Sequence, residues 1–231
     1  MLNKIYYILK QRIYQIMKRN KPCQGKVYMF HEINDNKGLY SISKNDFEVF
    51  LLWLINNKKI ITVEEMKNDK DRNGVVLTFD DAYASVYKNA YPLLKELKVP
   101  YYIFLNNELL DKENYITKSM IEEMISDSEC ILGSHGLKHV LSRSIEDDIF
   151  RESLLLSKKQ LEEQFNVKIS DFAFPYGSMY ACSKKNIEIA SKVFENIFMT
   201  YNLSYNKEYN NIIPRVNINC DNYSGEMKWF Q

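Results

Sequence analysis

The chain alternates between short runs rich in β-branched and aromatic residues and longer stretches in which apolar residues recur every three or four positions. The short runs predict strands and the longer stretches predict helices. Predicted strands occupy residues 26–31, 74–79, 101–105, 130–133, 171–174, 197–201 and 212–218, and predicted helices occupy 47–57, 83–98, 117–126 and 144–165. Regular alternation of this kind is typical of an α/β fold, a parallel sheet or barrel with helices outside it.

Local signals predict where some helices begin or end. Ser43 and Asp46 have the spacing of a capping box at the start of the first of these helices, and Ser144 and Asp147 have it at the start of the last. Pro92 lies within the helix predicted over 83–98. Because proline lacks an N–H and clashes with the preceding turn, we expect that helix to end or kink there.

The N-terminal segment, residues 1–22, is predicted to be separate from a single main domain at 23–231. Between Leu2 and Met17 apolar side chains recur at helical spacing, and residues 1–21 contain six basic residues and no acidic one. Such a basic amphipathic helix either lies on an anionic membrane surface or packs across the open end of the domain. Lys21-Pro22 predicts a short break after this helix.

The remaining 210 residues hold 25 basic and 30 acidic residues. The net charge of +1 is therefore the sum of a basic N-terminal segment and a mildly acidic main domain. This balance argues against a general nucleic-acid binder. No window approaches the roughly 18 uninterrupted apolar residues of a membrane span, and no secretory signal is recognisable. Four widely spaced cysteines favour reduced thiols. We therefore expect a cytoplasmic protein, with peripheral contact at the inner membrane face through residues 1–21.

An acidic pair, Asp80-Asp81, directly follows the predicted strand that ends in Thr78-Phe79. In parallel α/β folds, functional residues gather where the strands end. Neighbouring side chains on extended backbone point to opposite sides, so one carboxylate could bind a cation while the other acts as a base. The alternative is that one of them caps the following helix.

A histidine pair, His135 and His139, follows another predicted strand. On a helical turn, this spacing presents two imidazoles to one ion. With one carboxylate of the acidic pair, the histidines would supply three protein ligands and leave positions for water and substrate. That arrangement is typical of a catalytic metal site. The alternative is two unrelated surface histidines.

The loop Phe174-Pro175-Tyr176-Gly177 follows the predicted strand that begins at Asp171. Proline fixes one backbone torsion and glycine permits an unusual one, so the loop has a defined shape. Such a loop can direct a backbone N–H at a developing oxyanion, while its residues and Tyr83 contact a sugar ring. An ordinary turn with buried aromatic side chains is the alternative.

Three motifs, in this order, resemble those of the NodB-type polysaccharide deacetylases, carbohydrate esterase family 4. They are Thr78-Phe79-Asp80-Asp81, Ser134-His135 with His139, and Phe174-Pro175-Tyr176-Gly177. The resemblance covers about residues 26–220. It implies a distorted (β/α) barrel of about seven strands and metal-dependent removal of N- or O-acetyl groups from a carbohydrate. It also implies roles for five residues: metal ligands at Asp81, His135 and His139, a catalytic base at Asp80, and an oxyanion-stabilising backbone N–H at Tyr176.

The chain departs from the usual family pattern at three points. Ala82 stands where the first motif usually ends in glycine, so the following loop can differ in shape. No histidine follows His139; His31, at the end of the first strand, resembles the catalytic acid of the subgroup containing biofilm poly-N-acetylglucosamine deacetylases. A buried structural histidine is the alternative. The arginine that often precedes the third motif is absent, and Arg215 either replaces it beside Asp80 or forms a surface salt bridge.

These assignments predict a divalent ion, zinc first, with cobalt, nickel or iron(II) as alternatives. The expected substrate is an N-acetylated oligo- or polysaccharide, or a lipid-linked sugar. Asp80 would accept a proton from the attacking water, and His31 would protonate the departing amine. Two other functions stay open: a catalytically silent carbohydrate-binding protein of the same fold, and a metal-dependent hydrolase of another amide or ester.

Overall fold

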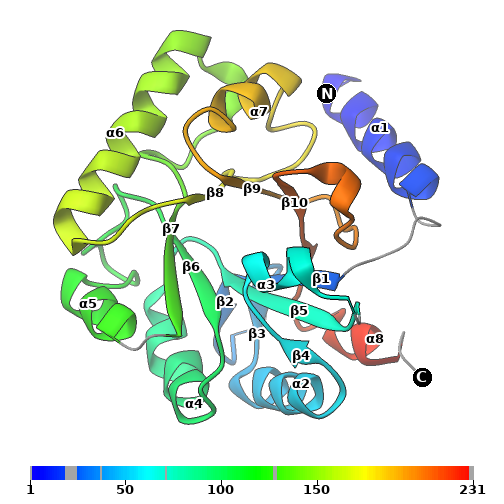
Figure 1. The fold of residues 1–231 in the computed structure, drawn as a ribbon, viewed down its shortest axis with the longest axis vertical. Helices are drawn as coiled ribbons and strands as arrows, with labels where there is room; N and C mark the ends of the chain where they lie inside the picture. The colour runs from blue at the N-terminus through cyan, green and yellow to red at the C-terminus, as the bar shows by residue number, and fades with distance from the viewer. Residues whose placement is uncertain (1, 19–24, 37, 71, 127–128, 229–231) are drawn as a thin grey trace.

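A path of eight parallel strand segments forms the main sheet of the described residues, which are 2–18, 25–36, 38–70, 72–126 and 129–228 of the computed structural model (Figure 1). The order along the path is β10-β9-β8-β7-β6-β5-β1-β11. The bounds are β1 (Gly25–Phe30), β5 (Gly74–Phe79), β6 (Tyr101–Leu105), β7 (Cys130–Ser134), β8 (Asp171–Ala173), β9 (Asn196–Met199), β10 (Ile212–Pro214) and β11 (Val216–Asn217). β4 (Lys59–Ile60) pairs with β5 off this path, and β2 (Glu32–Ile33) pairs with β3 (Ser41–Ile42) in a small separate sheet.

The last two strand segments, β10 and β11, close the sheet into a barrel. β10 pairs with β9, whereas β11 pairs with β1 at the other end of the path. The two segments are separated only by Arg215, whose N–H donates to Met199 O at 2.8 Å. The strand predicted over 212–218 is thus one run that changes its partner at Arg215. Counted as one, it gives seven strands around the barrel, which confirms the expected architecture.

Helices surround the barrel, and one of them packs against the side chains of its interior (Figure 1). They are α1 (Leu2–Lys18), α2 (Lys44–Asn57), α3 (Val63–Asn68), α4 (Tyr91–Glu96), α5 (Lys118–Ser126), α6 (Asp147–Phe165), α7 (Lys184–Ala190) and α8 (Tyr223–Lys228), with shorter helical turns at Val86–Ala90, Ser142–Ser144 and Lys207–Tyr209. No helix in the described ranges combines the length and the apolarity needed to cross a membrane. The predicted break at Lys21-Pro22 lies outside the described residues.

The helix expected over 83–98 is present over 84–96, and it is disrupted at Pro92 as predicted. A π-helical turn precedes α4, because Pro92 cannot donate a backbone hydrogen bond and its ring needs a wider preceding turn. Another helix prediction needs correction. The expected start at Ser144 is wrong, since Ser144 ends a separate short turn and α6 begins after Glu146 without a side-chain cap. Ser43 does cap α2, because its side chain accepts a hydrogen bond from Asp46 N.

Successive side chains along a strand point to opposite faces, so they contribute in turn to two hydrophobic clusters, one inside the barrel and one between the barrel and the helices. Val27, Val76 and Phe198 point into the barrel, where they meet Val63 and Met66 of α3. Their strand neighbours pack outward against the surrounding helices, and include Tyr28, Leu77 and Ile197. The interior is therefore a packed core, and the site for chemistry is restricted to the edge where the strands end.

Candidate active site

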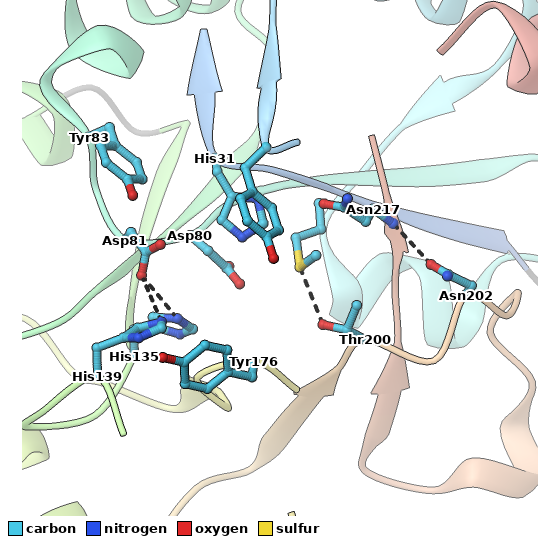
Figure 2. Close-up of a pocket in the computed structure, with 12 residues that line it drawn as sticks. His31, Asp80, Asp81, Tyr83, His135, His139, Tyr176, Thr200, Asn202 and Asn217 are labelled. Carbon is cyan, nitrogen blue, oxygen red and sulfur yellow. Dashed lines mark hydrogen bonds and ion pairs between the residues drawn. The ribbon is translucent and has the colours of Figure 1, made fainter. Parts of the chain in front are cut away.

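A cavity of about 350 Å³ opens at the edge where the parallel strands end (Figure 2). Its size suits a small ligand. Five of its lining residues are the histidines and carboxylates that the sequence indicated as site candidates: His31, Asp80, Asp81, His135 and His139. The parallel topology brings together residues that directly follow β1, β5 and β7 and lie up to more than 100 positions apart in the chain.

Asp81, His135 and His139 form a compact set of metal-ligand atoms. Asp81 Oδ1 lies 3.4 Å from His135 Nε2 and 3.3 Å from His139 Nε2, and the donor atoms all lie within 4.8 Å of one another. The two histidines occupy an irregular loop after β7, with Gly136 at φ +84°, and not the helical turn that we predicted. Their convergence results from this loop and not from helical spacing.

The hydrogen bonding of His135 prepares it to bind a cation. Its Nδ1 lies 2.8 Å from Ala173 O, and because a carbonyl only accepts, Nδ1 carries the proton. The Nε2 lone pair therefore faces Asp81 and His139, as in metal sites whose histidines are oriented by a backbone carbonyl. Burial opposes the charge on Asp81, but His135 and His139 outweigh it and lower the pKa of this carboxyl to about 2. A carboxylate and two imidazoles fit a divalent transition-metal ion.

Asp80 is held by a fully buried arginine. Arg215 Nη1 and Nη2 donate to the two carboxylate oxygens of Asp80 at 2.6 and 2.7 Å, and Nη1 also donates to Thr78 Oγ1 at 3.2 Å. Both side chains of the ion pair are nearly inaccessible. Burial raises the pKa of Asp80, but Arg215 and His135 outweigh it and hold that pKa below the ordinary value. The arginine is not part of a surface salt bridge; it fixes the orientation of a buried carboxylate.

The loop after the acidic pair keeps an unusual backbone without the expected glycine. Asp81 and Ala82 both have positive φ, at 62° and 53°. This left-handed region disfavours residues with a Cβ. The loop is held by neighbouring backbone, since Ile116 N donates to Ala82 O at 2.8 Å and Ala84 N donates to Asn114 O at 2.9 Å. The turn also breaks the strand alternation, which lets Asp81 reach the same cavity as Asp80.

His31 follows β1 and lines the cavity opposite the histidine pair (Figure 2). Its ring packs against Tyr40, with centroids 5.0 Å apart. Among the described residues, no group forms a hydrogen bond with the buried Nδ1 of His31. Burial lowers the pKa of His31, although the carboxylates of Asp80 and Asp81 partly offset it. A histidine with a satisfied structural role would have a partner on this nitrogen.

The third predicted loop supplies Tyr176 but not its neighbours. Tyr176 is 53% exposed and has φ 63°, and its ring packs edge-on against His139 with centroids 4.6 Å apart. Gly177 also has positive φ, and a Cβ there would lie 2.5 Å from Thr200 Oγ1, so only glycine fits. Within the described part of the chain, the Tyr176 N–H makes no hydrogen bond.

Phe174 and Pro175 are corrections to the predicted sugar-binding set. Phe174 is fully buried and stacks on Phe150 of α6, with ring centroids 5.9 Å apart. Phe174 lies two positions after Phe172, so both side chains point to the same, outer side of the barrel wall. Pro175 is buried and lines a different, apolar cavity. Tyr83 does line the active-site cavity, and its ring stacks on Tyr115.

Five further lining residues were not predicted as site residues: Met29, Tyr40, Thr200, Asn202 and Asn217. Thr200 comes directly after β9, so the rule that sites collect at strand ends would have indicated it. Asn217 lies two positions after Arg215, and the strand period of two would have placed it on the same face. Tyr40 has no comparable signal, since it lies between two short strands of a side sheet.

Comparison with known proteins identifies the family. The family model described as polysaccharide deacetylase matches residues 67–193, more than half of the chain. A poly-beta-1,6-N-acetyl-D-glucosamine N-deacetylase from Staphylococcus aureus is 30% identical over 186 residues, covering 72% of this chain and 63% of that protein. The chain thus spans about 60% of the length of the curated relatives that it matches.

Solved structures show the same fold. The structure of IcaB from Ammonifex degensii superposes with a TM-score of 0.78 at 22% identity, covering 91% of this chain and 98% of that one. The Streptococcus pyogenes deacetylase PplD also gives a TM-score of 0.78, at 19% identity, with 89% and 97% covered. The family model over more than half of the chain, together with the order of the acidic pair, the histidine pair and the Tyr176 loop, shows that the chain belongs to the NodB-type polysaccharide deacetylase family.

Proposed function

We propose that this protein is a metal-dependent hydrolase that removes acetyl groups from a polymer of N-acetylglucosamine, converting an acetamide and water into a free amine and acetate. The observation that carries the proposal is the compact Asp81–His135–His139 donor set in one cavity with Asp80, whose carboxylate is paired with Arg215. The matched relative from Staphylococcus aureus supports the choice of an N-acetylated glucosamine polymer.

Asp81, His135 and His139 would hold a divalent ion, and zinc suits their mixed oxygen and nitrogen donors, with cobalt, nickel or iron(II) as alternatives. Such an ion lowers the pKa of the attacking water and polarises the acetamide carbonyl. The protein's contribution is to fix the three donors: the loop conformation of Asp81 and the hydrogen bond between His135 Nδ1 and Ala173 O orient two of them before binding.

The other groups handle protons and developing charge. Asp80, kept ionised by Arg215, accepts the proton of the attacking water. The Tyr176 N–H is available to stabilise negative charge on the carbonyl oxygen. His31 protonates the departing nitrogen, and its lowered pKa makes its imidazolium a stronger acid than free histidine. Tyr83 and the exposed ring of Tyr176 border the cavity and would contact the sugar.

An acetate-release assay tests the function directly. Oligomers of β-1,6-linked N-acetylglucosamine incubated with the metal-loaded protein are expected to yield one acetate for each free amine formed. Asp80→Asn, which keeps the side-chain shape but cannot accept the proton, serves as the inactive control. Oligomer binding without acetate release would instead indicate a silent carbohydrate-binding protein, and release from simple amides or esters alone would indicate a different hydrolase.

Replacing His31 by glutamine is expected to lower turnover of the N-acetylated sugar by about 10²-fold, the scale of a lost general acid. Hydrolysis of an aryl acetate should be nearly unchanged, because a phenolate leaves without needing a proton. Comparison of the two substrates separates proton donation from a packing role. Equal losses on both substrates, or no loss on either, would reject the assignment of His31 as the acid.

A further inference from the structure

Helix α1 is attached to the barrel through its polar face. Gln11 Nε2 donates to Thr200 O at 3.0 Å, Gln11 Oε1 accepts from Met179 N at 3.1 Å, and Gln15 Nε2 donates to Tyr201 O at 2.7 Å. Arg143 adds a further contact, because its Nη1 donates to Tyr7 OH and its guanidinium lies 4.2 Å from the centre of the Tyr7 ring. The side of α1 that packs is therefore polar and aromatic.

The opposite side of the helix is apolar and exposed. Ile5, Leu9, Ile13 and Ile16 follow one another at intervals of four, four and three residues, so they form one stripe along α1. Their side chains are 50%, 54%, 58% and 71% exposed. This stripe is called the α1 apolar face below. A helix of a globular domain normally buries such a face against the core, and here the orientation is reversed.

The charged side chains of α1 itself are all basic. Lys10 and Arg12 are exposed and lie on opposite sides of the stripe, given 100° of rotation for each residue. Residues 1–21 contain six basic residues and no acidic one. An anionic lipid surface matches both features, since it accepts apolar side chains and attracts the flanking cations. A second copy of the chain fits less well, because two such faces would bring like charges together.

The helix is also linked to the catalytic edge of the barrel. Thr200, whose carbonyl accepts from Gln11, lines the active-site cavity, and Met179 belongs to the loop that follows Tyr176. Figure 1 shows α1 running beside the barrel near α7 and β10. Anything that binds the exposed face of α1 therefore lies near the loops that form the cavity wall.

We propose that the α1 apolar face inserts into the interface of an anionic lipid bilayer, while the basic side chains beside it contact the lipid headgroups. The helix then keeps the active-site edge close to the membrane surface, where a growing or lipid-linked glycan would be presented. The proposal does not depend on the reaction catalysed, because it concerns a face of the protein outside the cavity.

Vesicle co-sedimentation tests the proposal with the full chain. Binding is expected to vesicles of phosphatidylcholine mixed with phosphatidylglycerol, to be weaker for phosphatidylcholine alone, and to fall as salt is raised. Leu9→Glu with Ile13→Glu should weaken binding to the mixed vesicles by at least about tenfold, because two charges replace buried apolar contacts. The matched control, Leu155→Glu with Leu156→Glu on the exposed side of α6, adds the same charge elsewhere and should bind like the unmodified chain.

Two results would overturn the proposal. One is equal vesicle binding by the unmodified chain and the α1 double variant. The other is light scattering that shows a dimer without lipid, which the α1 double variant dissociates; the face would then be a contact between copies. Acetate release from soluble oligomers, measured on the same samples, should be unchanged by the α1 substitutions. A failure of the membrane proposal is thereby distinguished from a failure of the proposed activity.

Discussion

Asp81→Asn is expected to lower the rate of acetate release by at least about 10³-fold and to reduce the divalent-metal content of the purified protein. The carboxylate is the only anionic member of the Asp81–His135–His139 set, and a metal contribution of about 4 kcal/mol to the transition state corresponds to roughly this factor. Asparagine is chosen because it tolerates the left-handed backbone found at this position, where φ is 62°. The fold should therefore survive the substitution.

A matched control for this variant is Asp111→Asn. Asp111 has a similar backbone conformation, at φ 61°, but lies in an exposed loop away from the cavity. Its activity and metal content should equal those of the unmodified protein. Chelation of the unmodified protein should reproduce the loss seen with Asp81→Asn, and adding zinc back should restore activity only where Asp81 is present. Full activity in the chelated protein would contradict the metal-dependent mechanism.

Arg215→Met is expected to lower the free energy of unfolding by about 3–5 kcal/mol. The substitution leaves the carboxylate of Asp80 buried without its two hydrogen bonds from the guanidinium, and an uncompensated buried charge costs this much. Arg215→Lys keeps a positive charge but cannot donate to both oxygens at once, so a smaller loss is expected. Urea unfolding followed by circular dichroism measures both, and the lysine variant remains informative if the methionine variant does not fold.

The double variant Asp80→Asn with Arg215→Met separates charge pairing from packing. Removing the carboxylate charge should restore a large part of the stability lost in Arg215→Met, because the unpaired charge is gone. The solvent-exposed pair Lys168–Glu195 provides the comparison, since Lys168→Met should leave the free energy of unfolding nearly unchanged. Equal losses at Arg215 and Lys168 would mean that the buried pair contributes no more than a solvent-exposed one.

The alternation of strands and helices could be predicted from the sequence because each element carries its own local signal. The β-branched run before Asp80 and the capping serine at the start of α2 both act within a few residues. The disruption at Pro92 was also predictable, and it is present as a widened helical turn. The prediction failed between His135 and His139, where a loop with Gly136 replaces the expected helical turn.

The candidate site was predicted in part, because residue types and their order can be read from the sequence but the direction of each side chain cannot. The types and order of the acidic pair, the histidine pair and Tyr176 indicated the chemistry, and the structure brings these groups into one cavity. The prediction placed Phe174 in the site, but one step along a strand reverses the direction of a side chain, and Phe174 points into the layer between barrel and helices. Asn202 could not be identified, because a lone asparagine in a loop has no pattern.

By itself, the sequence determined the kinds of group available: three candidate metal ligands, one further carboxylate, one further histidine and a helix with an apolar stripe beside basic residues. The tertiary structure alone decided which of them meet. Arg215 reaches Asp80, 135 positions away, because the last strand changes its partner at that residue and closes the barrel. Tertiary packing likewise decided that the polar face of α1 contacts the barrel and that its apolar face stays exposed. Local patterns set the faces of an element, and only long-range pairing and packing decide what each face contacts.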